Sequence, residues 1–338
     1  MELTYPKKKI DYLTLEKQSS LFSGNLRQNS VYHYTSIGGL KGILSNQTLH
    51  FTNIKYMNDK DEYIAGLDSL AKVYGFSSEE HAKIKSVLTS QKVQTFVCCF
   101  SLKKDSLPMW NYYTKEINNQ GYNIEFDDKK LVESILRNNP CLDGCEISFG
   151  KVDYSKDNDS EYSIAIANEI ISSFKVLGLR LQTLFEKNIC NAASSTPNKE
   201  TLEKTISNIE KKKNRVPIFF YNGEKCRFEK NPSENYLYFI KRDCFRQEKE
   251  FRIVISVPDE LLPKLTDKKV YKFRISNGVL VPYLELKFSK EVVKSLTISP
   301  TVKSDLVEQS IQDFIKYSGY NIEDFSKFIK HSEIPVRF

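Results

Sequence analysis

The chain contains no long hydrophobic run. None of its 338 residues lies in a stretch approaching the roughly 20 apolar residues that a membrane-spanning helix needs. Three lysines at residues 7–9 are followed by no apolar segment, so the start of the chain does not read as a signal peptide. We therefore expect a cytoplasmic protein without a membrane partner.

The common nucleotide and hydrolase motifs are also missing. The sequence holds no Gly-x-Gly-x-x-Gly, no P-loop, no Gly-x-Ser-x-Gly and no His-Glu-x-x-His. These absences argue against Rossmann dehydrogenases, P-loop NTPases, common serine hydrolases and zincin proteases.

Cysteine spacing gives no support for a metal site. The seven cysteines are odd in number and scattered, which indicates reduced thiols in a protein of this size. Cys141 and Cys145 lie close together, but no second pair follows at zinc-site spacing. We expect no structural metal.

The charge balance is mildly basic. A net charge of +7 suits an anionic ligand such as a dinucleotide or RNA, although a lysine-rich solvated surface explains most of it equally well. With 40% hydrophobic and 12% aromatic residues, the chain can bury a sizeable core.

Ordered structure is predicted to begin with residues 31–35, an aromatic and β-branched run typical of a strand. Ser36 can then cap a helix whose apolar residues, among them Leu40 and Leu44, fall on one face. Residues 48–52 form a second short strand. Residues 93–101 are apolar on both faces, which predicts a strand in the centre of a sheet.

Further strands and helices alternate irregularly along the chain. Strands are expected at 121–127, 146–154, 236–240, 248–257, 270–275, 279–288 and 296–298, and helices at 62–74, 79–90, 303–318 and 322–330. Without a regular βαβ order, this pattern favours an α+β fold with a mixed or antiparallel sheet.

The chain divides into three parts by composition. Residues 1–29 read as an N-terminal arm or helix. Residues 30–155 and 236–338 form the α+β core, and residues 156–235 form a mainly helical insertion, because the apolar period there becomes helical.

Residues 247–255 carry the sharpest local pattern. With a strand period of two, Glu248, Glu250 and Arg252 share one face, and Phe251 and its apolar neighbours share the other. Two carboxylates about 7 Å apart raise the pKa of one, and a nearby arginine keeps the other ionised. This arrangement suits a general base or the stabilisation of a developing cation, but a solvated strand face with a salt bridge has the same pattern.

Histidine and tryptophan are scarce, with four and one residues. His33 stands between Tyr32 and Tyr34, which offer an aromatic wall for a small-molecule pocket, although a hydrogen-bonded structural histidine fits the strand too. Trp110 is followed by two tyrosines, and its neighbourhood is either core packing or a stacking surface for nicotinamide or a base.

A carboxylate-rich loop follows the second strand at residues 58–62. Its spacing does not fit an EF-hand, because the glycine and the terminal glutamate are missing. We expect turn formation and helix capping there. A magnesium-dependent nuclease using Asp59, Glu62 and Glu248 stays open as a third function.

Several short motifs occur together in a fixed order. They are Tyr32-His33-Tyr34-Thr35, Asn58-Asp59-x-x-Glu62, Met109-Trp110-x-x-Tyr113, Gly121-x-x-Ile124-x-Phe126-Asp127, Glu248-x-Glu250-x-Arg252 and Ser332-x-Ile334-Pro335-x-Arg337. In this order they resemble the microbial family catalogued as domain of unknown function 2971. The resemblance covers about residues 30–154 and 236–338.

A more distant resemblance concerns chemistry. An early His-bearing strand, a central aromatic and a late Glu-bearing strand are similar to the His-Tyr-Glu arrangement of ADP-ribosyltransferases, which implies a split sheet and NAD as substrate. Carried over, the resemblance makes Glu250 catalytic, with Glu248 and His33 assisting. The residues that would contact NAD are His33, Tyr34, Thr35, Trp110, Tyr113 and Arg252. The chain departs from the pattern at Tyr34, where many such enzymes have glycine, and at Arg252, which is not part of it.

Two functions of different class follow. The first is an NAD-dependent ADP-ribosyltransferase or NAD glycohydrolase, acting as a microbial defence or toxin effector on a nucleic-acid or protein acceptor and restrained by a partner protein. The second is a non-catalytic sensor module that binds a nucleotide or a partner.

Overall fold

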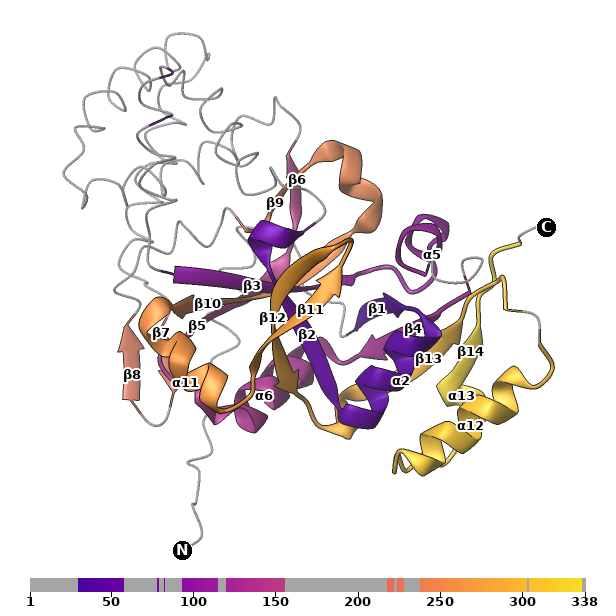
Figure 1. Ribbon diagram of the computed structural model, residues 1–338. Coiled ribbons are helices and arrows are strands. Elements are labelled where there is room, and N and C mark those ends of the chain that lie inside the picture. Colours follow the sequence, from indigo (N-terminus) through magenta and orange to yellow (C-terminus); the bar gives the residue numbers. More distant parts are fainter. Residues whose placement is uncertain are drawn as a thin grey trace, which may run out of the picture. The chain divides into compact units, whose positions relative to one another are not determined.

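A computed structural model describes residues 30–57, 93–114, 120–155, 218–221, 224–227, 238–302 and 304–335, together with residues 78 and 82 (Figure 1). The chain divides into two compact units. The sheet unit holds residues 27–60, 92–152 and 244–338, and the second unit holds residues 1–26, 61–91 and 153–243. The N-terminal arm, residues 58–62 and most of the expected helical insertion lie outside the described residues.

The sheet unit is built on a ten-stranded sheet in the α+β class. Its first elements are β1 (Val31–Thr35), α2 (Ile37–Asn46), β2 (Thr48–Asn53) and the turn η1 (Ile54–Tyr56). Ser36 caps α2 through a side-chain oxygen that accepts from the amide of Gly39, as the sequence predicts. Strand β3 (Val93–Ser101) lies in the centre of the sheet, also as predicted.

The remaining elements of the sheet unit follow in chain order. They are α5 (Leu107–Tyr113), β4 (Tyr122–Phe126), α6 (Asp128–Asn138), η2 (Pro140–Leu142), β5 (Glu146–Lys151), η4 (Asp243–Glu248), β10 (Glu250–Pro258), η5 (Asp259–Leu261), α11 (Leu262–Asp267), β11 (Tyr271–Ser276), β12 (Val279–Lys287), η6 (Lys290–Val292), β13 (Val293–Ile298), α12 (Val307–Tyr317), α13 (Phe325–Phe328) and β14 (Ile329–His331).

The sheet forks at β3. Strand β10 pairs with β3 along the whole of residues 93–101, so it occupies one edge of that strand. The other edge is shared, because β2 pairs at Phe96 and Val97 while β1 pairs at Ser101. Two branches leave this edge, β2-β12-β11 and β1-β4-β13-β14, and β5 flanks β10 on the far side. All the pairs are antiparallel except β13 with β14, so the sheet is mixed.

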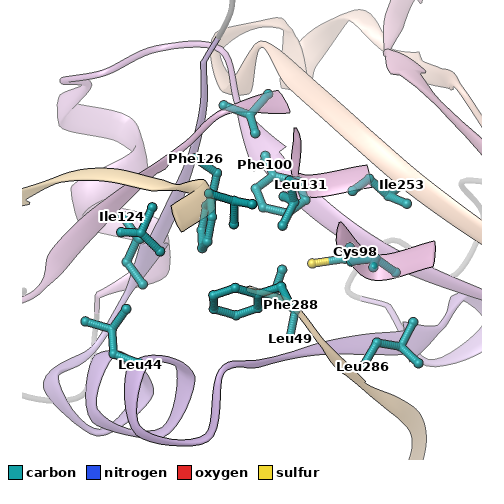
Figure 2. Packing of buried hydrophobic residues seen from close by; sticks show 14 of the residues in the cluster. Leu44, Leu49, Cys98, Phe100, Ile124, Phe126, Leu131, Ile253, Leu286 and Phe288 are labelled. Carbon is teal, nitrogen blue, oxygen red and sulfur yellow. The ribbon is translucent and has the colours of Figure 1, made fainter. Parts of the chain in front are cut away.

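One face of the sheet carries the main hydrophobic core. Phe96, Cys98 and Phe100 of β3 lie opposite Ile255, Ile253 and Phe251 of β10, and all six are buried. Helices α2, α6 and α12 pack their apolar residues against this face. Figure 2 shows the aromatic centre of the core, where the ring of Phe126 lies 6.0 Å from that of Phe100 and 5.4 Å from that of Phe288.

Some element boundaries differ from those predicted. Glu248 ends the turn η4 instead of lying on a strand, because Lys249 adopts a φ of 45° and breaks the extended run. The expected helix at 322–330 is only one turn, α13, and the chain then becomes β14. Ile329 is buried against β13 there, so strand pairing replaces the last helical turn.

The second unit is described by its strands. Strand β6 (Asp153–Ser155) pairs in parallel with β9 (Ile240–Arg242), and β7 (Ile218–Tyr221) pairs antiparallel with β8 (Glu224–Arg227). The strand predicted at 236–240 begins at Ile240 instead, after a turn at residues 238 and 239. Among the described residues of both units, no helix is long and apolar enough to cross a membrane.

Candidate active site

Glu250 and Arg252 form a buried ion pair at the start of β10. Arg252 donates from Nε and Nη2 to Oε2 of Glu250, over 2.8 and 2.6 Å. The side chains are 3% and 0% exposed, so the face that they share is not the solvated strand face that the pattern also allowed. Two charges removed from water in this way depend on each other, because either one alone would carry a large desolvation cost.

Glu248 reaches the same region from η4. It is buried, and the hydroxyl of Tyr113 donates to its Oε1 over 3.1 Å. Burial raises the pKa of Tyr113 well above its usual range, and the negative charges of Glu248 and Glu250 raise it further. The fold thus brings together two carboxylates, one protonated phenol and one guanidinium.

Strand register decides which other side chains share this face. Glu250 lies opposite Ser101, and Ser101 lies opposite Tyr32 on its other side. Directly opposed residues project to the same face, so Tyr32 belongs with Glu250 and His33, the next residue, projects to the other face. The ring of His33 accordingly lies 5.5 Å from that of Phe100, a residue of the main core. The structure does not bring His33 to Glu250.

His33 occupies the fork of the sheet. Its Nδ1 lies 3.2 Å from the carbonyl oxygen of Cys99, on the stretch of β3 between the pairings with β2 and with β1. Burial lowers the pKa of His33, and the Cys99 carbonyl opposes this in part. A neutral imidazole that donates to this carbonyl fastens β1 to β3 beside the fork.

Two of the aromatic candidates, Trp110 and Tyr34, form a small buried cluster with Met109. Trp110 and Tyr34 are buried, with ring centroids 4.7 Å apart and nearly perpendicular planes. The hydroxyl of Tyr34 donates to the carbonyl oxygen of Lys103, and Thr35 is buried beside it in the strand. Because Trp110 is only 1% exposed, its faces are already packed, and the accessible rings are those of Tyr112 and Tyr113.

Asp105 is a contributor that the motifs did not single out. Its Oδ1 accepts from the indole nitrogen of Trp110 over 2.7 Å, and its carboxylate also accepts from the hydroxyl of Ser332 and the amide of Glu333. One carboxylate therefore fastens α5 to the chain after β14. The only sequence signal is its place just before the Ser106-Leu107-Pro108 helix start.

The nuclease alternative stays a prediction, because the structure describes only one of its three residues. Asp59 and Glu62 lie outside the described residues, and Glu248 is bonded to Tyr113. Within the part of the chain that the structure describes, no group of three or more His, Cys, Asp or Glu side chains could hold a metal ion.

A comparison with family models finds one match. Residues 109–253 match the family described as a protein of unknown function (DUF2971). The match supports the resemblance carried by the motifs, although it also spans residues 156–235, which the motifs left out. It includes Tyr113, Glu248, Glu250 and Arg252 but not His33. Comparison with curated proteins gives no match, and comparison with solved structures gives none either.

Proposed function

We propose that the chain is an NAD-cleaving enzyme, an ADP-ribosyltransferase or NAD glycohydrolase, in which Glu250 and Glu248 act on the ribose. The observation that carries the proposal is the convergence of Glu248, Glu250 and Tyr113 on one sheet face. A pair of carboxylates beside an aromatic ring suits a reaction in which positive charge develops on a sugar.

The forked sheet supports the same proposal. The resemblance to ADP-ribosyltransferases implies a split sheet. In this chain β1 and β10 pair with opposite edges of β3, the strand at which the sheet forks. Because a fold alone does not identify a reaction, the proposal depends on the carboxylates of Glu248 and Glu250.

The proposed reaction breaks the bond between nicotinamide and ribose C1. Nicotinamide leaves with the bonding electron pair, and the ribose acquires oxocarbenium character. The carboxylate of Glu250, oriented by Arg252, stabilises that charge. Water or an acceptor nucleophile then adds at C1, and Glu248 accepts the proton that the nucleophile loses.

In this proposal the nicotinamide ring packs against an exposed tyrosine. Tyr113 is 37% exposed and already contacts Glu248, so it can present a ring surface beside the reacting bond. Trp110 and Tyr34 are packed against each other and buried, whereas Thr35 is buried on the other face of β1, where its hydroxyl lies next to Gly39 of α2. NAD contact by His33 stays a prediction, because its ring lies on the other face of the sheet.

Nicotinamide release tests the proposal. Purified protein is incubated with NAD alone, with total RNA and with cell lysate, and free nicotinamide is measured. Glu250→Gln should lower the rate roughly 100-fold or more, as the loss of one group that stabilises transition-state charge does in other enzymes. The matched control is Glu260→Gln, because Glu260 is exposed just after β10. Equal rates for wild type and Glu250→Gln would exclude the assignment.

The additives identify the acceptor. Release that needs RNA indicates a nucleic-acid acceptor, release that needs lysate indicates a protein acceptor, and release in buffer indicates hydrolysis. A microbial defence or toxin role, with a partner that restrains the activity, predicts that expression of the wild type slows growth and that Glu250→Gln does not.

One observation favours a second function, a non-catalytic module that binds a nucleotide or partner. Glu250 and Arg252 are buried and hydrogen-bonded to each other, as the two members of a purely structural ion pair are. On this alternative, NAD or another nucleotide binds without turnover. Folded wild-type protein that releases no nicotinamide under any condition would favour it.

A further inference from the structure

Helix α5 carries Tyr113, and it is too short to hold its own position. Its seven residues are fewer than the roughly 12 that an isolated helix needs in water. Ser106 stands at its N-cap without making a side-chain capping bond. The place of Tyr113 relative to Glu248 therefore depends on the contacts that α5 makes along the rest of its length.

Asp105 supplies the polar part of those contacts. Its Oδ1 accepts from the indole nitrogen of Trp110 over 2.7 Å. The same carboxylate accepts from the hydroxyl of Ser332 over 2.8 and 2.9 Å and from the amide of Glu333 over 2.8 Å. We call these four residues the Asp105 network. Figure 1 shows the yellow chain after β14 rising toward α5, where the network forms.

An apolar contact reinforces the Asp105 network. The rings of Trp110 and Tyr34 lie edge to face with centroids 4.7 Å apart, and Ile334 packs against the same cluster. The hydroxyl of Ser332 also accepts from the amide of Ile334, which fixes the local path of the chain. The Ser332-x-Ile334 motif, to which the proposed function gives no role, thus contacts α5 through both a carboxylate and an apolar cluster.

The other end of α5 reaches the candidate active site. The hydroxyl of Tyr113 donates to Oε1 of Glu248 over 3.1 Å. Next to it, the hydroxyl of Thr114 donates to the carbonyl oxygen of Trp110 over 2.6 Å, so the end of the helix is bonded to its middle. A rigid element with packed side chains at both ends carries a displacement from one end to the other. A displacement of Trp110 therefore reaches Tyr113.

We propose that Asp105 and Ser332 are positioning residues of the candidate active site. Acting through α5, they hold the hydroxyl of Tyr113 on Glu248. The kinetic consequence rests on the proposed function, in which Tyr113 packs on nicotinamide and Glu248 accepts a proton. The coupling along α5 does not rest on it, and it is measured separately.

A double-mutant cycle tests the coupling on the full chain without NAD. Urea unfolding gives the free energy of unfolding of the wild type, Ser332→Ala, Tyr113→Phe and the double variant. Substitutions at separate sites that share no partner lower stability additively. Coupling through α5 predicts that the double variant loses less than the sum of the two single losses, because a displaced Tyr113 no longer depends on its hydroxyl. Additive losses overturn the proposal.

Ser326→Ala is the matched control for this cycle. The hydroxyl of Ser326 also donates to an aspartate, Asp324, but at the start of α13 and not at α5. Its loss should add to that of Tyr113→Phe. The conservative variant Ser332→Thr keeps the hydroxyl and should behave as the wild type.

Trp110 is the only tryptophan of the chain, so its fluorescence reports on α5 directly. Ser332→Ala should shift its emission to longer wavelength and make it more accessible to acrylamide, because Trp110 is buried while the network is intact. Ser332→Thr and Ser326→Ala should leave both properties unchanged. Unchanged fluorescence in Ser332→Ala overturns the proposal, since Trp110 would then keep its place without the network.

Nicotinamide release tests the consequence for the site. Ser332→Ala should lower kcat about 10-fold or more, as small misplacements of groups around reacting atoms do. In the Tyr113→Phe background, where the hydroxyl is already absent, it should have little further effect. Equal losses in both backgrounds overturn the proposal. A wild type that releases no nicotinamide contradicts the proposed function instead, and the unfolding cycle then decides the coupling by itself.

Discussion

The hydroxyl of Tyr113 donates a hydrogen bond to Glu248 across 135 residues of sequence. It fastens the end of α5 to the turn that leads into β10, and so sets the position of one carboxylate relative to the other. Tyr113→Phe removes a donor from a buried acceptor, which should lower the free energy of unfolding by about 1–3 kcal/mol. Urea unfolding measures this, with Tyr112→Phe as the matched control at an exposed ring.

Arg252 should be far more important for stability than a surface arginine. Arg252→Met leaves the carboxylate of Glu250 buried without its cation, which should cost about 3–5 kcal/mol. The double variant Glu250→Leu with Arg252→Met should recover most of that loss, because it removes both charges. Denaturant unfolding of the single and double variants measures the difference. A single variant as stable as the wild type would contradict the buried pair.

Glu125 should make the stability of the fold depend on pH in the acidic range. Burial alone would raise its pKa, but hydrogen bonds from Ser295 and Ser30 and the ammonium of Lys330 outweigh burial and lower it. A carboxyl whose pKa is lower in the folded state contributes stability above its unfolded pKa and loses it as the pH falls. The stability difference between wild type and Glu125→Gln should therefore shrink as the pH falls from about 6 to about 3. A difference that stays constant over this range would contradict the network.

His33 should affect the stability of the fold at higher pH than Glu125 does. Burial lowers the pKa of His33, so the folded state favours the neutral ring. The unfolded chain then takes up protons first, and stability falls as the pH drops below the ordinary histidine pKa of about 6.5. In His33→Gln the loss of stability between about pH 7.5 and pH 5.5 should be smaller than in the wild type. Since burial also lowers the pKa of His50, the variant His50→Gln measures its share separately.

Substitution by alanine should change the stability of the fold in opposite directions at two glycines. At Gly121 an added Cβ would overlap the buried side chain of Thr114 and lie 2.8 Å from the carbonyl oxygen of Thr35. At Gly42, inside α2, an added Cβ would meet nothing within 4 Å. Gly121→Ala should therefore destabilise by about 1–3 kcal/mol, and Gly42→Ala should stabilise by up to about 1 kcal/mol. Thermal unfolding of the two variants decides the signs.

Local chemistry predicted much of the sheet unit. The bounds of β1 and β3, the cap at Ser36 and the central place of β3 all follow from side-chain patterns over a few residues. The extent of the last helix does not, because Ile329 leaves it to pair with β13, a contact that no local pattern reveals.

The site was predicted less completely. The alternation through Glu250 and Arg252 is readable from the sequence, and the two residues do pair. The turn at Glu248 depends on contacts with the end of β3, where the hydroxyl of Ser101 donates to the carbonyl of Glu248 and the amide of Leu102 donates to the carbonyl of Lys249. The separation of His33 from Glu250 depends on register, which three strands set together.

The way β5 meets β10 has a consequence for chain closure. The amide of Val152 donates to the carbonyl of Glu250, so the chain leaves the sheet and returns to it at adjacent points. The residues between them close a loop on the sheet, and its last residues, Glu248 and Lys249, also bond to the end of β3. The entropy of closing a loop grows only logarithmically with its length, so lengthening or shortening this stretch changes the free energy of the sheet little. A chain built this way can change the length of the stretch before η4 while keeping Glu248 and the ladder that carries Glu250 and Arg252.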